Sequence, residues 1–311
     1  MTVIALVGPT AAGKSALAVQ LAQRLGAEIV SADSMQVYIG MDIGTAKPTL
    51  SERAGIPHHM IDVWEPSQEV SVVAFREQAR TIVADILRRD RPVIVVGGSW
   101  LYVQAVLDEW DFPGTDPRVR ARLEEELVAV GAPELHARLA TLDPAAAAAI
   151  LPSNGRRIVR ALEVVELTGG FSARLPEPRP WVPARWIGLA WDRLALDARI
   201  TERVDRMREQ GLVDEVVALR ERGIGRTASG ALGYRQLLDA LEGGGTLEAA
   251  WRETVDRTRK FARRQERRFR QDARVRWLVA GSSTPVAVGS AEPPRLANMA
   301  DDALRLLAEP G

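Results

Sequence analysis

A glycine-rich segment near the amino terminus has the residue types and spacing that bind phosphate groups. Residues 8–15 read Gly-Pro-Thr-Ala-Ala-Gly-Lys-Ser and match G-x-x-x-x-G-K-[ST]. In this pattern backbone N–H groups and a helix N-terminus converge on an anion, the lysine contacts the outer phosphate, and the serine hydroxyl coordinates Mg²⁺. We therefore predict a di- or triphosphate site made of Gly8, Pro9, Thr10, Ala11, Ala12, Gly13, Lys14 and Ser15, with Mg²⁺ on Ser15.

A carboxylate follows the next predicted strand. Asp33 comes shortly after the short strand expected over residues 28–31. Because ligands bind beyond the carboxyl ends of strands in an open α/β sheet, we expect Asp33 to face the phosphate site. A carboxylate there can hold a metal or accept a proton, and the alternative is an ordinary turn aspartate. The strand expected over residues 92–98 ends in glycines instead of an acidic residue, which disfavours motor ATPases and GTPases.

Residues 251–277 combine a helical apolar pattern with an excess of positive charge. Eleven arginine and lysine residues stand against four acidic ones in this segment. Solvated helix faces usually mix the two signs, so the excess favours a phosphodiester backbone as partner over a merely solvated face. Smaller basic groups occur within residues 118–122 and 156–160. The charge pattern therefore predicts a nucleic-acid partner.

The overall composition excludes several classes of protein. Among 311 residues, 46% are hydrophobic, and 41 basic side chains balance 41 acidic ones, which is ordinary for a globular protein. The chain has no cysteine, which excludes disulfides, thiolate zinc sites and a cysteine nucleophile, and its three histidines disfavour a histidine-rich metal centre. We find neither an apolar run of ~20 residues nor a signal-peptide pattern, and expect a cytoplasmic protein without a membrane partner.

The elements that position these residues follow from apolar periodicity. Short strands are predicted at residues 3–7, 28–31, 92–98 and 186–190, and helices at 16–25 and 72–87. This alternation predicts an α/β fold, with a parallel P-loop sheet core flanked by helices. Within a helical insertion, Asp116 and Ser153 are the expected helix caps. The predicted domains are the first part of the core (1–113), the insertion (114–182), a return strand with basic C-terminal helices (183–280), and a linker and tail (281–311).

Taken together, the motifs resemble those of the tRNA dimethylallyltransferase (isopentenyl-diphosphate:tRNA transferase) family. The resemblance extends from residue 3 to about residue 277, in the order of the family. Besides residues 8–15, the matching stretches are SADSMQVY at 31–38, GMDIGTAKP at 40–48, PHHMID at 57–62, VGGSWLY at 96–102, RRIVRALEV at 156–164, ALGYR at 231–235 and RRQERRFR at 263–270. Serine replaces the usual threonine at Ser99, and the family's common basic residue and tryptophan are absent at Gly230 and Arg268.

The resemblance implies a reaction, partners and site residues. The enzyme would transfer a dimethylallyl group from dimethylallyl diphosphate to the exocyclic N6 amine of the adenosine 3′ to the tRNA anticodon, releasing diphosphate. It implies the tRNA anticodon stem-loop as partner, Mg²⁺ as cofactor and a monomer. The implied catalytic residues are Asp33 as general base, Lys14, Thr10, and Arg199 on the diphosphate. The implied tRNA contacts are Asp33, Ser34, Met35, Gln36, Ser99, Arg120, Arg156, Arg157, Arg160, Tyr234, Arg235, Arg263, Arg264, Arg267 and Arg270.

The chemistry of the reaction gives these residues distinct roles. An adenine amine is a poor nucleophile that becomes acidic as it attacks the allylic carbon, and a carboxylate such as Asp33 can accept its proton. Loop amides, Lys14 and Mg²⁺ would stabilise the departing diphosphate. Three alternatives remain open: prenylation of a free adenine nucleotide, a P-loop small-molecule kinase, and a non-catalytic RNA-binding protein. The insertion and the arginine-rich helix disfavour the first alternative, and the missing strand-end acid disfavours the second. The third gives Lys14 and Asp33 no purpose.

Overall fold

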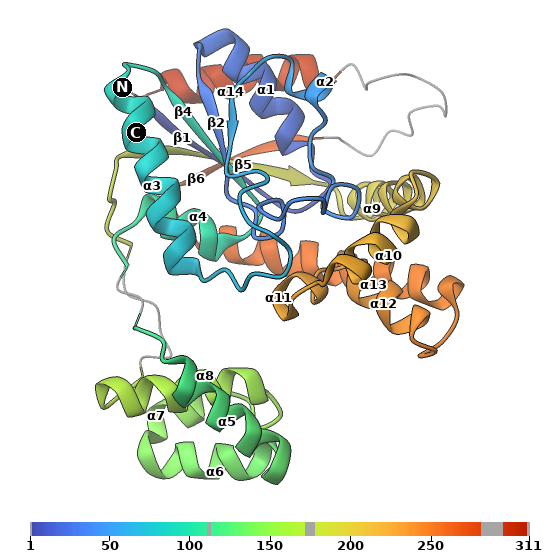
Figure 1. Ribbon diagram of the computed structural model, residues 1–311. Coiled ribbons are helices and arrows are strands. Elements are labelled where there is room, and N and C mark those ends of the chain that lie inside the picture. Colours follow the sequence, from blue (N-terminus) through green and yellow to red (C-terminus); the bar gives the residue numbers. More distant parts are fainter. Residues whose placement is uncertain (1, 111–112, 172–177, 281–294, 310–311) are drawn as a thin grey trace. The chain divides into compact units, whose positions relative to one another are not determined.

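The structure is a computed structural model that describes residues 2–110, 113–171, 178–280 and 295–309 (Figure 1). It divides into two compact units. The first combines Met1–Asp108 with Pro180–Gly311, and the second is Glu109–Arg179. The insertion predicted over residues 114–182 thus corresponds to a separate unit with somewhat different bounds.

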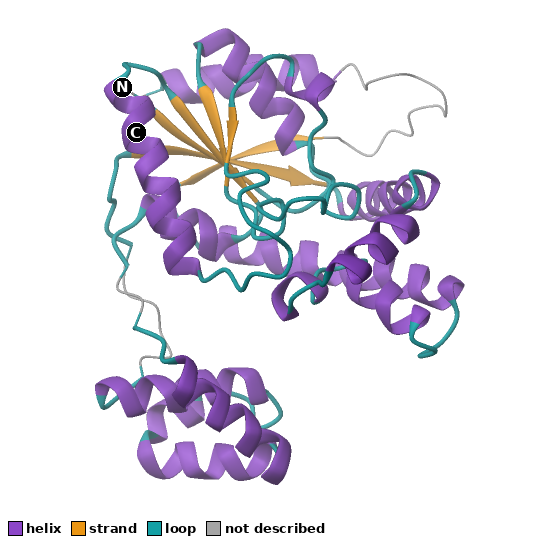
Figure 2. Cartoon of the chain, viewed as in Figure 1, coloured by secondary structure: helices purple, strands orange, loops and turns teal. Residues whose placement is uncertain are grey.

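A six-stranded parallel sheet forms the centre of the first unit (Figure 2). The strands lie in the order β3-β2-β4-β1-β5-β6. Their bounds are β1 (Val3–Val7), β2 (Glu28–Ser31), β3 (His58–His59), β4 (Val93–Gly97), β5 (Ala184–Trp191) and β6 (Val275–Ala280). Val7 is in register with Gly97 of β4 and Gly188 of β5, so the loops after β1 and β4 leave from the same edge. The predicted α/β fold with a parallel P-loop sheet is confirmed.

Alternate residues of β1 face two separate hydrophobic cores. Ile4 and Leu6 pack in the core beneath α1 (Lys14–Leu25) and α14 (Arg295–Ala308). Val3, Ala5 and Val7 pack in the core formed by α3 (Val72–Arg88), α4 (Trp100–Leu107) and the C-terminal helices. Because strand side chains alternate between faces, the continuous apolar run at residues 3–7 requires cover on both sides.

The helices after β5 build the part of the first unit that faces the phosphate loop. Their bounds are α9 (Arg193–Glu209), α10 (Leu212–Arg222), α11 (Arg226–Ser229), α12 (Tyr234–Leu241) and α13 (Leu247–Phe269), and a short helix α2 spans Leu50–Arg53 between β2 and β3. No helix in the described residues is long and apolar enough to cross a lipid bilayer.

The second unit is a bundle of helices with its own core. Its helices are α5 (Pro117–Val130), α6 (Ala132–Leu142), α7 (Pro144–Ala148) and α8 (Gly155–Thr168), and Leu123, Leu139 and Leu162 are among the residues buried between them. Asp116 caps α5 by accepting from two backbone N–H groups, as predicted. The prediction that Ser153 caps α8 is wrong by one residue, because the Asn154 side chain accepts from Arg157 N.

The chain ends in a helix that belongs to the core. Residues 281–311 are predicted to be linker and tail, and residues 281–294 lie outside the described part. Within α14, however, Met299, Ala300 and Ala303 are buried against the core beneath α1. Arg24 of α1 pairs with Asp301, and Arg276 of β6 donates to the Leu306 carbonyl at 2.7 Å. The prediction of a tail is therefore wrong for residues 295–308.

Candidate active site

The loop between β1 and α1 has the conformation of a phosphate cradle. Ala11 and Gly13 have positive φ angles of 63° and 89°, and Gly13 is the N-cap of α1, so the α1 N-terminus opens onto the loop. Lys14 Nζ donates to Pro9 O at 2.7 Å. Burial of the lysine, with a further contribution from the positive charge of Arg203, lowers its pKa to about 7. A lysine held this way gains its charge most readily when an anion is bound beside it.

Two arginines of α9 hold this loop, four residues apart and therefore on one helix face. Arg203 Nη1 donates to Thr10 Oγ1 at 3.0 Å and its Nη2 to Thr45 O at 3.3 Å. Arg199 instead donates from Nε to Ala11 O at 2.9 Å and lies over the Trp191 ring. Arg203, which the sequence reasoning missed, is thus the arginine on the side chain of Thr10. Its spacing from Arg199 was the available signal.

Asp33 lies within electrostatic reach of both cations. Lys14 and Asp33 follow β1 and β2, whose carboxyl ends lie at the same edge of the parallel sheet, and Arg203 is bonded to Thr10 of the loop after β1. The charge of Asp33 acts on both Lys14 and Arg203. Asp33 Oδ1 accepts from Met35 N at 2.8 Å and Gln36 N at 3.3 Å. Asp33 therefore also makes the turn that was the alternative interpretation, and these bonds fix the orientation of its carboxylate. The end of β4 lies beside it, where a Cβ on Gly97 would come within 2.6 Å of Ala32 O.

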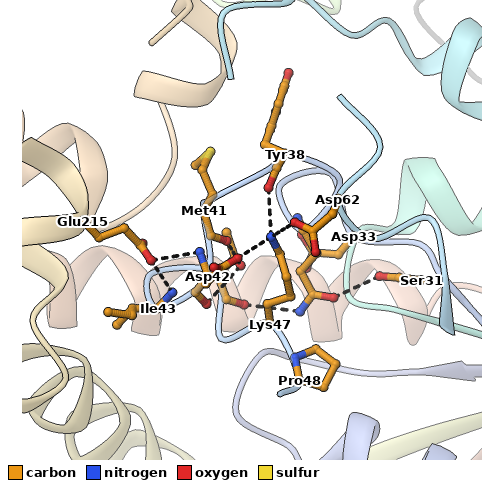
Figure 3. A network of polar contacts seen from close by, with 12 residues as sticks. Ser31, Asp33, Tyr38, Met41, Asp42, Ile43, Lys47, Pro48, Asp62 and Glu215 are labelled. Atoms are coloured by element: carbon orange, nitrogen blue, oxygen red, sulfur yellow. Dashed lines mark hydrogen bonds and ion pairs between the residues drawn. The ribbon is translucent and has the colours of Figure 1, made fainter. Parts of the chain in front are cut away.

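The loop after Asp33 is held by a polar network around a buried lysine (Figure 3). Lys47 Nζ donates to Tyr38 O at 2.9 Å and to Asp42 at 2.6 Å, and it also contacts Asp62. Gln36 accepts from Ser31 Oγ at 3.0 Å and donates to Thr45 O at 3.3 Å. A buried ammonium is stable only with such partners, and this one joins both ends of the loop.

Glu215 of α10 holds the same loop from the other side. Its carboxylate accepts from Asp42 N at 3.0 Å and Ile43 N at 2.8 Å, and from the Tyr234 hydroxyl at 2.6 Å. Tyr234 is 0% exposed, and burial together with the Glu215 charge raises its pKa above the usual range. Tyr234, which the resemblance assigns to tRNA binding, has its ring in the core, so this side chain supports the loop through Glu215, and its contact with tRNA stays a prediction.

The other predicted RNA contacts are spread over several elements of both units. Ser34, Met35 and Gln36 are half-buried in the loop after β2, and Ser99 starts α4 without a side-chain capping bond. On the C-terminal helices Arg235, Arg263, Arg264, Arg267 and Arg270 are exposed. In the second unit Arg156 and Arg157 are exposed, whereas Arg120 and Arg160 both pair with the buried Glu163. Arg120 and Arg160 therefore have a structural role besides any contact with RNA.

A basic hollow lies between the start of α9 and the end of α13. It has a volume of about 410 Å³ and is lined by Arg193, Arg263, Glu266, Arg267, Arg270 and Gln271. Asp197 pairs with Arg263 at 3.1 Å and Glu266 with Arg270 at 2.6 Å, so the hollow is only partly neutralised. Such a surface suits a phosphodiester backbone.

The described residues contain no group of three or more histidine, cysteine, aspartate or glutamate side chains that would hold a metal ion alone. Ser15, by contrast, is exposed at the first turn of α1. Magnesium is commonly held by one or two protein oxygens together with substrate phosphates and waters. A hydroxyl at the cradle fits a magnesium ion that arrives with a diphosphate.

Comparisons with known proteins agree with one another. A sequence model of the family described as "IPP transferase" matches residues 36–272. The chain is 60% identical to a tRNA dimethylallyltransferase of Thermobifida fusca over 89% of each chain, and 58% identical to one of Streptomyces coelicolor over 90% of each. A crystal structure of a tRNA isopentenylpyrophosphate transferase from Bacillus halodurans superposes with a TM-score of 0.69, at 40% identity, covering 98% of this chain and 96% of that one. A eukaryotic dimethylallyltransferase acting on tRNA superposes with a TM-score of 0.72, at 27% identity, covering 90% and 74%.

Proposed function

The chain belongs to the tRNA dimethylallyltransferase family, and from this premise we propose how its residues carry out the reaction. The enzyme is a prenyltransferase that moves a dimethylallyl group from dimethylallyl diphosphate to the N6 amine of the adenosine 3′ to the anticodon in tRNA. The C1–O bond to the diphosphate breaks, a bond from C1 to N6 forms, and N6 loses a proton. The protein must therefore stabilise an anionic leaving group and accept one proton.

The phosphate loop holds the leaving diphosphate. Its amides and the α1 N-terminus offer partial positive charge, and Arg203 adds a full charge at Thr10. Lys14 becomes charged when the anion binds beside it. These groups are fixed before reaction by bonds to Pro9 and Thr45, so little reorganisation is needed as charge develops. We assign the role on the diphosphate to Arg203 in place of Arg199, whose guanidinium is stacked on Trp191.

Ser15 would hold Mg²⁺ together with the diphosphate oxygens. The bound ion supplies charge neutralisation of the leaving group. The chain itself contributes the exposed Ser15 hydroxyl at the first turn of α1.

Asp33 accepts the proton from N6. Two backbone amides orient its carboxylate, and Lys14 and Arg203 lie within the range of its charge. Because the adenine amine is stacked inside the anticodon loop, it must leave the stack to reach this carboxylate.

The single observation that carries the proposal is that Asp33 and Lys14 follow strands whose carboxyl ends lie at the same edge of the parallel sheet, where Arg203 is bonded to the phosphate loop. The test is mass spectrometry of nucleosides after incubation of the protein with dimethylallyl diphosphate and an anticodon stem-loop RNA. We expect N6-dimethylallyladenosine at the adenosine 3′ to the anticodon. Parallel incubations replace the RNA by AMP, or the prenyl donor by ATP. Product from AMP alone would establish the free-nucleotide reaction instead, and phosphoryl transfer from ATP would establish a kinase.

A further inference from the structure

A buried glutamine connects the arginine-rich helix to the phosphate loop. Gln265 lies on α13, is 8% exposed, and accepts from Thr10 N through Oε1 at 2.9 Å. The loop after β4 packs on the same amide, because a Cβ on Gly98 would lie 2.5 Å from Gln265 Nε2. The side chain is thus enclosed between the loops that follow β1 and β4.

Thr10 is held from two helices at once. Gln265 binds its backbone amide and Arg203 of α9 binds its hydroxyl. The two helices are themselves joined, since Ala262 packs against Leu196 and Ile200, and Arg259 donates to Thr201 at 2.8 Å. A displacement of α13 therefore changes the position of Thr10 unless the Gln265 bond breaks.

Exposed arginines flank Gln265 on α13. Arg264, Arg267 and Arg268 lie one to three residues from Gln265 and are exposed. RNA bound to these side chains restricts the motion of α13, and α13 fixes Thr10 through Gln265. A diphosphate bound in the phosphate loop restricts Thr10, and through the same bond it also restricts α13. Two ligands that order one element lower each other's ordering cost, which produces positive coupling between their sites.

We propose that Gln265 is a positioning residue that couples RNA binding on α13 to diphosphate binding in the loop. The inference rests on the proposed function, because it takes the loop as the diphosphate site and α13 as the RNA face. Coupling between two sites is reciprocal and commonly amounts to about 5–150-fold in affinity.

The test measures the dissociation constant of inorganic diphosphate, with magnesium, in the presence and absence of saturating anticodon stem-loop RNA. We expect at least about fivefold tighter binding with RNA for the wild-type protein. Gln265→Met removes the side-chain oxygen that accepts from Thr10 N and keeps a side chain of similar volume. For this variant the ratio of the diphosphate dissociation constants without and with RNA should fall below about twofold, since a ratio of ~1 means no coupling. Gln265→Glu keeps an oxygen on Thr10 N, so its ratio should stay near that of the wild type even if its added charge weakens diphosphate binding overall.

Gln210→Met is the matched control, since Gln210 is exposed at the end of α9 and should keep the wild-type ratio. Because each ratio is taken within one variant, a general loss of stability does not imitate the effect. The proposal is overturned if the wild type has no coupling, if Gln265→Met keeps it, or if Gln210→Met also loses it. Prenyl transfer is assayed on the same samples. If the wild-type protein does not transfer the prenyl group, that result contradicts the proposed function and leaves the measured coupling unaffected.

Discussion

Lys14 is the residue whose charge depends most on what the phosphate loop holds. Its pKa is lowered to about 7 in the free protein, so near neutral pH about half of the molecules carry a neutral lysine there. A bound diphosphate favours the ammonium and raises the pKa again. Binding therefore takes up a proton when the pH is above about 7.

The first prediction concerns pH. Diphosphate affinity should weaken as pH rises above about 7, with uptake of about one proton per site at pH 8, because Lys14 must be recharged. Calorimetry in buffers of different ionisation enthalpy measures this uptake. Lys14→Arg is the reference, since arginine stays charged, and it also corrects for titration of the diphosphate. Equal proton uptake by Lys14→Arg and the wild type would contradict the assignment.

The same shift has a consequence for stability. The folded pKa of about 7 lies below the ordinary value of 10.5, so the unfolded chain binds more protons between these values. The free energy of unfolding of the ligand-free protein should therefore rise with pH from about 7 upwards. This contribution to the rise is absent in Lys14→Met, which keeps the pH dependence of all other groups. Urea titrations of both proteins at pH 7 and pH 9 measure the difference, which should be larger for the wild type.

The two arginines of α9 provide a second comparison. Arg203→Ala should lower kcat/KM for dimethylallyl diphosphate by about 10²–10³-fold, the usual cost of losing a donor to developing negative charge. Arg199→Ala should lower it less and reduce the melting temperature, because Arg199 mainly packs on Trp191 and binds Ala11 O. Steady-state kinetics and thermal melts give both values. A larger kinetic loss in Arg199→Ala would return the diphosphate role to Arg199.

At the scale of elements, the strands and the phosphate loop were predictable because their signals are local. The apolar run at residues 3–7 and Gly13-Lys14-Ser15 determine a strand, a loop and a helix without reference to distant residues. Arg203, Glu215 and Gln265 were not predicted, because each acts through a partner 170 or more positions away in the sequence, as with Gln265 and Thr10, which are separated by 255. Charged helices contain many such residues, and apart from the four-residue spacing of Arg203 from Arg199, only tertiary contacts distinguish these three.

The loop after β2 offers a test of its support. Tyr234→Phe removes one donor to Glu215 and should destabilise the protein by about 0.5–1.5 kcal/mol. For a unit of this size that lowers the melting temperature by a few degrees, on the order of 2–4 °C per kcal/mol. The dissociation constant for RNA should stay unchanged, because the hydroxyl is buried. A markedly weaker RNA affinity without loss of stability would show instead that the Tyr234 hydroxyl contacts the RNA directly.

At the scale of the molecule, the second unit can be deleted without breaking the core of the first, because the segments that lead into and out of it lie side by side. Asp108 and Pro180 form a β-bridge, and Trp181 N donates to Leu107 O at 2.8 Å, so the two crossing segments lie side by side within the first unit. The two units have separate cores. Composition predicted the insertion, whereas α14 was missed, because residues rich in small and polar side chains precede it and obscure its amphipathic pattern.

Replacing residues 109–179 with a short Gly/Ser linker should leave a folded protein that binds diphosphate as the full chain does. Its RNA affinity should be weaker, and the dependence of that affinity on salt shallower, because it lacks the arginines of α5 and α8 that we expect to contact phosphates. Circular dichroism, diphosphate titration and RNA binding at several salt concentrations make the comparison. An unchanged salt slope would mean that the second unit does not contact the RNA backbone.

The central claim is that Asp33 accepts the N6 proton while the phosphate loop retains the diphosphate. Single-turnover transfer by Asp33→Asn, with enzyme in excess over RNA, tests it most directly, because the amide keeps an oxygen for the turn and loses the basicity. The rate of dimethylallyladenosine formation should fall by about 10²–10⁴-fold, while the dissociation constants for RNA and diphosphate change far less. Transfer at the wild-type rate, or a loss of RNA binding as large as the loss of rate, would contradict the claim.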